Sequence, residues 1–360
     1  MPIEPRLQAW ATLAQKALPH RALVALLQTF GDPQAVLAAN RTSLAAVVPQ
    51  AAVDKVLANT DPARAEQCAA WLEVPGHEVI AWDDPDYPHT LLDIGDAPPV
   101  LFFVGRRELL NRPTVAIVGS RNASPQGCDN ARNFASALSQ AGLTIVSGLA
   151  AGIDAAAHEG ALGHAGSTLA VVGTGLDRVY PARHRALAHR VAEGGGLLSE
   201  FTPGTPPLKE NFPRRNRLLS GLSRGVLVVE ATLSSGSLMT ARLAGEQGRD
   251  VFAIPGSIHS PFSRGCHRLI REGAKLVETA DDVLTELQWP TRVITNSPSV
   301  PPTDEAEDAL LTAMGHDPID VDRLAQRTAR DAGEIAARLV THQIEGRVAS
   351  LPGGRWQRRR

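Results

Sequence analysis

Short apolar segments alternate with amphipathic segments between residues 114 and 273. The apolar segments are continuous and rich in Val and Ile, which is typical of parallel strands buried on both faces. Strands are predicted at residues 115–118, 143–146, 168–172, 197–199, 226–229 and 251–254, and helices at 126–141, 153–165, 183–194, 237–248 and 266–273. This alternation predicts the α/β class, with a doubly wound parallel sheet and right-handed crossovers.

The first 82 residues have a helical pattern instead. Leu7, Trp10, Ala11 and Ala14 recur at helical spacing, and further short helices joined by tight turns are predicted after them. We therefore expect residues 1–82 to form a small helical domain. The following stretch is rich in Pro and Asp and is predicted to be extended, with a short apolar strand at residues 100–104.

The C-terminal part follows a proline-rich stretch, residues 289–303, which is predicted to be a linker. Residues 304–360 then contain predicted helices at 305–314, 320–328 and 332–343 and predicted strands at 346–350 and 355–358. Three helices followed by a hairpin are the pattern of a winged helix. The expected recognition helix has Arg338 as its only Lys or Arg, whereas the wing and tail contain Arg347, Arg355, Arg358, Arg359 and Arg360.

Composition excludes several classes of protein. The 360 residues carry a net charge of −2, with 43% hydrophobic and 21% charged residues, which excludes wholesale disorder and a globally basic nucleic-acid binder. No apolar run approaches the roughly 18 residues of a membrane span, and the N-terminus lacks the pattern of a signal peptide. Cys68, Cys128 and Cys266 form no C-x-x-C motif, which disfavours disulfides and zinc and fits a cytoplasmic protein.

Three loops at the predicted carboxyl edge of the sheet are built from small residues. They contain Gly119-Ser120-Arg121, Ser147-Gly148 and Gly173-Thr174-Gly175. Ligands bind beyond this edge in a doubly wound sheet, and glycine lets a phosphate approach the backbone. Each loop alone is also typical of a tight turn, but together they predict a groove suited to a chain of phosphates. A dinucleotide site fits poorly, because the first run is G-S-R-N-A-S rather than G-x-G-x-x-G.

A basic segment precedes the fifth predicted strand of the alternating region. Between residues 203 and 224 a single acid, Glu210, accompanies the cations Lys209, Arg214, Arg215, Arg217 and Arg224. Arginines on a rigid element suit phosphate recognition. The alternative is that they form salt bridges with Glu200, Glu210 or Glu230. Ser235-Gly236-Ser237 opens a later helix, where hydroxyl residues serve as caps or as an anion cradle.

The sequence contains few features that would indicate an active site. No nucleophile–base pair, metal cluster or Walker motif is visible. Asp154 and His158 lie four apart on one predicted helix, which favours a local side-chain pair over half of a metal or catalytic site. We therefore expect no catalytic residues, no metal and no cofactor.

Together these motifs resemble the DprA/Smf family of DNA-processing proteins. The resemblance covers residues 87–280 and rests on Tyr87-Pro88 with Asp96-Ala97-Pro98-Pro99, Val118-Gly119-Ser120-Arg121, Ser147-Gly148-Leu149-Ala150 with Gly152-Ile153-Asp154, Gly175-Leu176-Asp177 with Tyr180-Pro181, Ser199-Glu200, Phe212-Pro213-Arg214-Arg215-Asn216-Arg217 and Ser235-Gly236-Ser237-Leu238. It implies an extended Rossmann-like domain at residues 83–288 that binds single-stranded DNA, flanked by an N-terminal SAM-like domain and a C-terminal winged helix. It also implies protection of incoming strands during natural transformation, loading of the recombinase RecA, and a homodimer formed through the Rossmann-like domain.

The motifs and the resemblance together define an expected DNA-binding site. Its residues are Gly119, Ser120, Arg121, Ser147, Gly148, Gly175, Arg183, Arg214, Arg215, Asn216, Arg217, Ser235, Gly236 and Ser237. Phe212 and Tyr180 are the nearby aromatic candidates for base stacking. Binding dominated by the nucleic-acid backbone predicts weak sequence preference and a preference for single strands.

Two other classes of function stay open from the sequence. A nucleotide-processing hydrolase of the phosphoribohydrolase type also uses a Rossmann-like sheet, and Glu230 at a strand end supports it, although the P-G-G-x-G-T-x-x-E signature of those enzymes is absent. A scaffold that works through the two flanking domains is the other. A strand binder prefers oligonucleotides over mononucleotides, whereas an enzyme turns a mononucleotide over.

Overall fold

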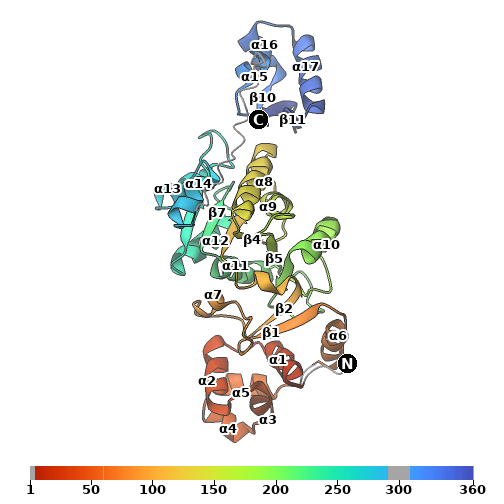
Figure 1. The fold of residues 1–360 in the computed structure, drawn as a ribbon, viewed down its shortest axis with the longest axis vertical. Helices are drawn as coiled ribbons and strands as arrows, with labels where there is room; N and C mark the ends of the chain where they lie inside the picture. The colour runs from red at the N-terminus through yellow and green to blue at the C-terminus, as the bar shows by residue number, and fades with distance from the viewer. Residues whose placement is uncertain (1–4, 60, 291–308, 360) are drawn as a thin grey trace.

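The computed structural model of the chain describes residues 5–59, 61–290 and 309–359. Three parts follow one another along the long axis of the molecule (Figure 1). The N-terminal helices lie at one end, a large sheet covered by helices lies in the middle, and the C-terminal unit lies at the other end. Within the described residues, no helix is both long enough and apolar enough to cross a membrane.

Short helices form the N-terminal part, as predicted. They are α1 (Pro5–Gln15), α2 (His20–Phe30), α3 (Pro33–Ala38), α4 (Arg41–Ala45), α5 (Gln50–Leu57) and α6 (Pro62–Leu72). The Asp32 carboxylate begins α3 by accepting a hydrogen bond from the Ala35 N–H, and Asn40 begins α4 in the same way through Ser43. The apolar faces of the helices pack around the buried Trp10.

The central sheet has nine strands in the described part of the chain. They are β1 (His77–Ala81), β2 (Val100–Gly105), β3 (Thr114–Val118), β4 (Thr144–Ser147), β5 (Thr168–Val171), β6 (Gly196–Ser199), β7 (Gly225–Val228), β8 (Asp250–Ala253) and β9 (Lys275–Leu276), arranged in the order β1-β2-β6-β5-β4-β3-β7-β8-β9. From β6 to β9 every neighbouring pair is parallel. The chain winds outward from β3 to β6 on one side and from β7 to β9 on the other. The winding therefore reverses between β3 and β7, which is where doubly wound sheets bind ligands.

Strand β1 corrects the prediction that the first 82 residues are helical. It pairs antiparallel with β2, and β2 pairs antiparallel with β6. Val79 and Ala81 pack into the core of the N-terminal helices, whereas Ile80 packs into the core of the sheet. Because both faces of this edge strand are needed as packing surfaces, tertiary contacts decide its conformation and the local pattern does not.

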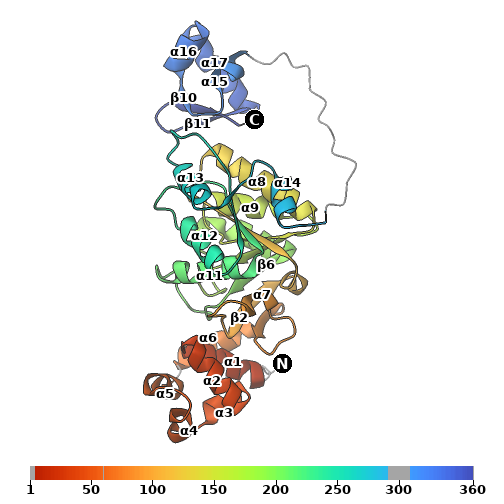
Figure 2. The same cartoon turned by 90° about the vertical axis from the view of Figure 1, so that its left-hand side faces the viewer.

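Helices cover both faces of the sheet. One face carries α8 (Pro125–Gln140), α9 (Ile153–Ala161), α10 (Arg185–Gly194) and α14 (Ala280–Glu286), and the other carries α7 (His89–Leu92), α11 (Asn211–Leu222), α12 (Ser237–Glu246) and α13 (Arg264–Arg271). Figure 2 shows α12 and α13 on one side of the middle part and α8 and α14 on the other. Two 3-10 turns, η1 (Arg107–Leu109) and η2 (Ala182–His184), join these elements. The predicted α/β class with a doubly wound sheet is confirmed.

Helix α11 was not predicted, although it holds the basic segment. Pro213 is its third residue, and the preceding loop contains Pro203, Pro206 and Pro207. Proline costs little in a first helical turn, because the backbone N–H groups there have no partner inside the helix. The prolines thus mark the start of a helix that the sequence pattern treats as a loop.

The C-terminal unit has the predicted winged-helix pattern. Its elements are α15 (Ala309–Met314), β10 (Ile319–Asp320), α16 (Val321–Thr328), α17 (Ala332–Ile344), β11 (Val348–Leu351) and β12 (Arg355–Arg358), with the strands in the order β10-β12-β11. Leu324, Ile335 and Leu339 form its buried centre. Most of the predicted linker, residues 291–303, lies outside the described residues.

Candidate nucleic-acid interface

A groove of about 750 Å³ lies at the carboxyl edge of the sheet, beside the reversal between β3 and β7. The loop after β3, the first turns of α11 and α12 and the loop after β8 form its walls. The predicted DNA-binding residues that line it are Gly119, Ser120, Arg121, Arg215, Asn216, Ser235, Gly236 and Ser237. The others, Ser147, Gly148, Gly175, Arg183, Arg214 and Arg217, do not line it.

The loop after β3 presents an arginine to the groove. A Cβ at Gly119 would lie 2.5 Å from Cγ1 of Ile153, so only glycine fits between β3 and α9. Ser120 N donates to the Glu230 carbonyl at 2.8 Å, which fixes the loop to the end of β7. Arg121 is exposed, and its guanidinium lies over the Phe212 ring, 5.7 Å from the centroid. In the described part of the chain it forms no ion pair, so its charge is offered to the groove.

Glu230 occupies the position where many nucleotide-binding folds hold a phosphate. Its carboxylate accepts hydrogen bonds from Ser124 N at 2.9 Å and Ser124 Oγ at 2.5 Å, at the first turn of α8. Burial raises the pKa of Glu230, and the hydrogen bonds from Ser124 oppose that rise. A carboxylate therefore already fills the N-terminal end of α8. This agrees with the absence of a dinucleotide-binding fingerprint from the sequence.

Arg215 crosses beneath the groove and binds the backbone of two strand ends. Its guanidinium donates to the carbonyl of Gly148 at 2.9 Å and to the carbonyl of Val171. Burial lowers its pKa to about 10, so it stays protonated at neutral pH. Asp154 binds the same loop from the other side, accepting from Gly148 N at 3.1 Å and Ala150 N at 3.4 Å. Arg215 and Asp154 therefore hold the loop after β4 in place.

The remaining arginines of α11 form ion pairs with Glu200, a buried carboxylate at the end of β6. Arg217 Nη2 lies 2.5 Å and Arg214 Nη2 2.8 Å from Oε2 of Glu200, and Arg217 Nε also lies 3.1 Å from Oδ2 of Asp96. Burial raises the pKa of Glu200, and the two arginine charges oppose that rise. The Arg217 side chain is only 10% exposed, whereas that of Arg214 is 54% exposed. Salt bridging, the alternative left open by the sequence, thus describes Arg217 best.

The start of α12 brings hydroxyl groups to the opposite wall. Ser235 Oγ and Ser237 Oγ lie 2.7 Å apart, and no side-chain hydrogen bond caps the helix at Gly236. Asn216 Nδ2 reaches the Gly236 carbonyl at 3.5 Å, which links this turn to α11. Small polar groups at a helix start suit an anionic ligand, and Arg121 supplies the charge that they lack.

Several predicted residues serve the framework. Ser147 Oγ is buried and donates to the Ile117 carbonyl at 2.7 Å, and Gly148 packs against Arg215. A Cβ at Gly175 would lie 2.6 Å from the Thr202 carbonyl oxygen. Arg183 is exposed on η2 and does not line the groove.

The structure adds lining residues that the sequence did not single out. Phe262 lines the groove from the loop after β8. The Phe262 carbonyl accepts a hydrogen bond from Ala231 N at 2.7 Å. Thr232, Thr240 and Asn122 also line the groove. The signal for Phe262 is an aromatic residue in a loop otherwise made of Pro, Gly and Ser. The Tyr180 and Phe212 rings, both named from the sequence, lie 5.5 Å apart between centroids.

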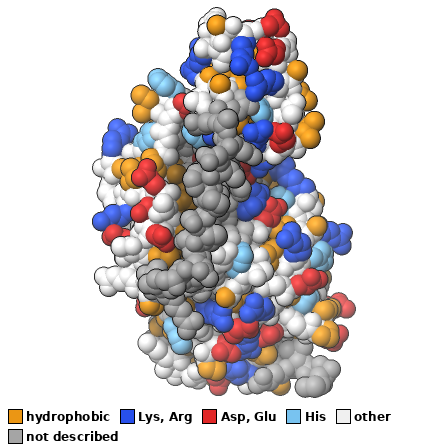
Figure 3. Space-filling view, turned by 45° about the horizontal axis from the view of Figure 1, so that its top comes forward, with side chains coloured by type: hydrophobic (Ala, Val, Ile, Leu, Met, Phe, Trp, Pro, Cys, Tyr) orange, Lys and Arg blue, Asp and Glu red, His pale blue; other side chains and the backbone are white. Residues whose placement is uncertain are grey.

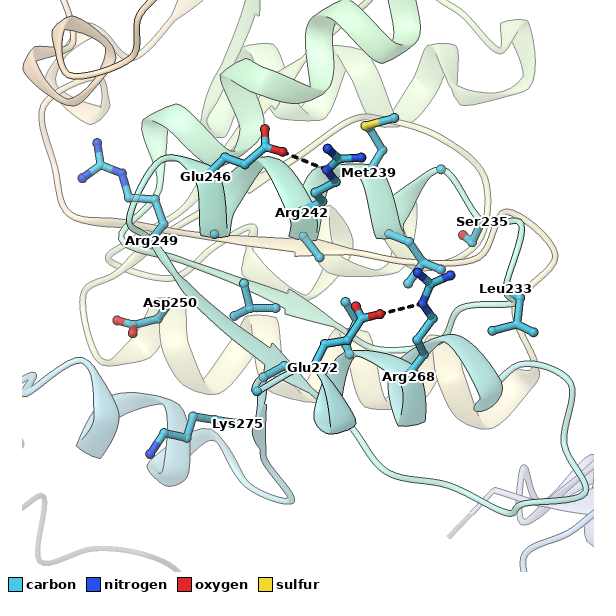
Figure 4. Close-up of a pocket in the computed structure, with 18 of the residues that line it drawn as sticks. Leu233, Ser235, Met239, Arg242, Glu246, Arg249, Asp250, Arg268, Glu272 and Lys275 are labelled. Atoms are coloured by element: carbon cyan, nitrogen blue, oxygen red, sulfur yellow. Dashed lines mark hydrogen bonds and ion pairs between the residues drawn. The ribbon is translucent and has the colours of Figure 1, made fainter.

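A second cavity, of about 770 Å³, lies on the outer side of α12 and α13 (Figure 4). Ion pairs between Arg242 and Glu246 and between Arg268 and Glu272 flank it, each at 2.8 Å. The exposed Met239 of α12 is among the residues that line it.

The charges that line the groove indicate which class of ligand the groove suits. On the face drawn in Figure 3, basic and acidic side chains are interspersed rather than sorted by sign. The groove differs, because its lining includes Arg121, Lys209 and Arg215 against the single buried acid Asp154. Within residues 5–59, 61–290 and 309–359, no cluster of three or more His, Cys, Asp or Glu side chains is arranged to hold a metal ion.

Comparison with known families decides which class of protein this is. The family model described as "DNA recombination-mediator protein A" matches residues 78–288, and the model described as "DprA winged helix domain" matches residues 295–354. The chain belongs to the DNA recombination-mediator protein A family. The resemblance to the DprA/Smf family that the motifs indicated is thus confirmed.

Named relatives agree with this assignment. The chain is 44% identical to Protein Smf of Escherichia coli over 297 residues, which cover 80% of this chain and 79% of that protein. It is 52% identical to DNA processing protein DprA of Streptococcus pneumoniae over 206 residues, which cover 57% of this chain and 73% of that protein.

Two solved structures are also similar. The X-ray structure of DNA processing protein A from Streptococcus pneumoniae has a TM-score of 0.68 and 40% identity, and the match covers 79% of this chain and 99% of that one. DNA processing protein A from Helicobacter pylori, whose structure is described in terms of its unique single-stranded DNA binding mode, has a TM-score of 0.54 and 31% identity. That match covers 59% of this chain and 96% of that one.

Proposed function

We propose that the chain binds single-stranded DNA in the groove beside β3 and β7 and acts as a recombination mediator rather than as an enzyme. The observation that carries the proposal is Arg121, an exposed guanidinium that forms no ion pair in the described part of the chain. It stands at the ligand-binding edge of a doubly wound sheet, opposite the hydroxyls of Ser235 and Ser237. Such a site suits an anionic ligand, and a row of phosphates provides one.

The arginines divide into two roles in this proposal. Arg121 and Lys209 contact phosphates directly, because both line the groove and are exposed. Arg215 and Arg217 are positioning residues, because their guanidinium groups bind backbone carbonyls and Glu200 inside the protein. Arg214 contributes charge at the rim while it neutralises Glu200.

The aromatic residues favour a single strand over a duplex. Tyr180, Phe212 and Phe262 line the groove together. Their rings can stack on bases only where the bases are not already paired and stacked inside a duplex. Stacking accepts every base, so we infer weak sequence preference. The description of the Helicobacter pylori relative supports the same ligand class.

The hydrolase alternative depends on Glu230, and the contacts of that residue disfavour it. Both carboxylate oxygens accept hydrogen bonds from Ser124 at the start of α8. A general base must lie within reach of a substrate or water. Glu230 does not line the groove, and Ser124 holds its carboxylate at the start of α8, so we assign it a structural role.

Two further parts of the proposal rest on the family. We infer that the chain loads RecA onto the strand that it protects during natural transformation, and that it forms a homodimer through the Rossmann-like part. The cavity outside α12 and α13, with Met239 and Leu276 exposed nearby on α12 and the edge strand β9, offers an apolar surface for a second copy. Light scattering on residues 76–290, a fragment that keeps β1 paired with β2, should give a dimer mass. A monomer at micromolar concentration would contradict the homodimer.

A competition experiment tests the proposed function. A fluorescent oligonucleotide bound to the full chain is displaced with unlabelled single strands, the corresponding duplex, or mononucleotides, and the mononucleotides are also followed for turnover. We expect single strands to compete best and mononucleotides to be neither bound tightly nor consumed. Equal competition by duplex, or conversion of a mononucleotide, would contradict the proposal.

A further inference from the structure

The C-terminal strand of the winged-helix unit contacts α8 through a defined set of side chains. Arg359 donates to both carboxylate oxygens of Asp129, with Nε 2.8 Å from Oδ2 and Nη2 2.6 Å from Oδ1. Gln357 Nε2 donates to Gln126 Oε1 at 3.0 Å. A bidentate arginine–carboxylate pair fixes orientation as well as distance. The winged-helix unit therefore has a specific seat on α8.

This seat lies beside the mouth of the groove. Ser124 begins α8 immediately after the loop that carries Arg121, and Asp129 follows five residues later, about 7.5 Å along the helix axis. Figures 1 and 2 both place the winged-helix unit beyond the N-terminal end of α8. The hairpin and the groove loop are therefore neighbours at the same edge of the sheet.

The docked hairpin is also the most basic part of the C-terminal unit. Residues 346–360 contain five arginines and no acid, and two of these arginines are already in ion pairs, Arg347 with Glu345 and Arg359 with Asp129. Arg355, at the start of β12, is exposed. Asp129, the acid nearest to the groove mouth on α8, is neutralised by Arg359 and by Arg132, whose Nη1 lies 2.9 Å from Oδ1. Docking therefore adds positive charge next to the groove and masks a negative one.

The covalent connection does not impose this seat. Trp289 is fixed at the opposite end of α8, where its Nε1 donates to the Ala141 carbonyl at 3.0 Å. The 16 residues of α8 are about 24 Å long. A segment of 18 residues, the number from 291 to 308, can span at most about 65 Å, which exceeds the length of α8. The length of the connection therefore does not fix the seat, and the contacts of Arg359 and Gln357 define it.

We propose that the winged-helix hairpin, seated on α8 by the Arg359–Asp129 ion pair, forms a second contact surface for single-stranded nucleic acid that continues the path of the strand beyond Arg121. This inference rests on the proposed function of the groove. Strands that fit within the groove do not reach the hairpin. Longer strands do, and their phosphates are bound by arginines of the hairpin outside these ion pairs, among them the exposed Arg355.

The test uses the full chain and two lengths of oligothymidylate, about six and about twenty nucleotides, at several salt concentrations. The variants are Arg359→Ala, Asp129→Ala and the double substitution. Arg323→Ala is the matched control, because Arg323 is an exposed arginine of the same unit whose ion-pair partner, Asp320, lies within that unit. Small-angle X-ray scattering on each variant reports whether the unit is still docked.

We expect Arg359→Ala and Asp129→Ala to increase the radius of gyration and to weaken binding of the longer strand by about three- to tenfold. The salt slope for that strand should flatten by about 1.4, which corresponds to two phosphate contacts. Binding of the shorter strand should not change, the double substitution should add little to either single one, and Arg323→Ala should resemble the unmodified chain.

Three results would overturn the inference. Unchanged scattering for both single variants would contradict the claim that the Arg359–Asp129 ion pair docks the unit on α8. Loss of docking with unchanged affinity for the longer strand would contradict the claim that the hairpin is a second contact surface. Tighter binding of the shorter strand after undocking would mean that the unit covers the groove instead of extending it. Failure of the unmodified chain to bind either length would contradict the proposed function itself, and with it this inference.

Discussion

The guanidinium of Arg215 fills the space that a side chain at position 148 would need. A Cβ at Gly148 would lie 2.6 Å from both Nη1 and Nη2 of Arg215, and the same guanidinium binds the Gly148 carbonyl at 2.9 Å. The two residues are 67 positions apart in the chain. Together, Arg215 and Gly148 fix the position of the loop after β4 beneath the groove.

Replacing this glycine should therefore destabilise the protein. In Gly148→Ala the new methyl group displaces Arg215 from its two carbonyl partners, and we expect a loss of about 2–3 kcal/mol in the free energy of unfolding. Urea unfolding measures it. Gly245→Ala on the exposed face of α12 is the control, because a Cβ there meets no atom within 4 Å and alanine favours the helix. Equal stability of the two variants would contradict the role given to Arg215.

Arg217→Ala should reduce stability far more than it reduces binding. The substitution removes one of the two arginines that neutralise Glu200, whose side chain is only 1% exposed. Because a buried carboxylate loses a partner, we expect a cost of about 3 kcal/mol. Arg242→Ala breaks an exposed i,i+4 pair with Glu246 and should cost about 0.5 kcal/mol or less. If Arg217→Ala keeps its stability and instead loses affinity with a flatter salt dependence, Arg217 contacts DNA directly.

The buried His158 makes stability depend on pH. Its Nδ1 lies 2.7 Å from Thr168 Oγ1, and burial lowers its pKa from 6.5 to about 3. Between these values the unfolded chain binds a proton that the folded chain does not, so stability falls as the pH falls. The slope is about 1.4 kcal/mol per pH unit, or about 2 kcal/mol between pH 7 and pH 5.

Urea unfolding of His158→Gln and of the unmodified chain at pH 7 and pH 5 measures this contribution. The variant should lose less stability than the unmodified chain over that interval. His189→Gln, which removes an exposed histidine of α10, should keep the full pH dependence. The same pH dependence in all three proteins would exclude His158 as its source.

Removal of residues 303–360 should leave most of the affinity for short single strands. All residues that line the groove precede residue 263. Fluorescence anisotropy with an oligonucleotide of about six nucleotides measures the change. A loss of more than about tenfold, or about 1.4 kcal/mol, would place the main binding surface in the winged-helix unit instead.

The sequence predicted the parallel strands and the loops at their ends well, because uniformly apolar strands between amphipathic helices leave few alternatives. It failed for β1, whose two faces pack against different cores, and for α11, whose first turn contains Pro213. Neither the packing of β1 nor the start of α11 can be recognised from the neighbouring residues in the sequence. A strand or helix that depends on partners far along the chain has no strong periodic signal of its own.

Part of the candidate site could also be predicted from the sequence. Gly119, Ser120 and Arg121, which line the groove, could be predicted because small residues at a strand end have a known geometric use. The division of the α11 arginines was not, because it depends on Glu200 and Asp96, which the fold brings to α11 from other loops. Phe262 was missed because its loop returns to the groove only after β8.

The salt dependence of single-strand affinity for Arg121→Ala tests the central claim most directly. For a short strand that stays within the groove, three phosphate contacts in the unmodified chain predict a slope of log K against log salt near −2. Arg121→Ala should weaken binding to all sequences alike and flatten that slope by about 0.7, with an unchanged melting temperature. Arg190→Ala, an exposed arginine of α10 outside the groove lining, should change neither. An unchanged slope and affinity for Arg121→Ala would contradict the claim that this groove binds the strand.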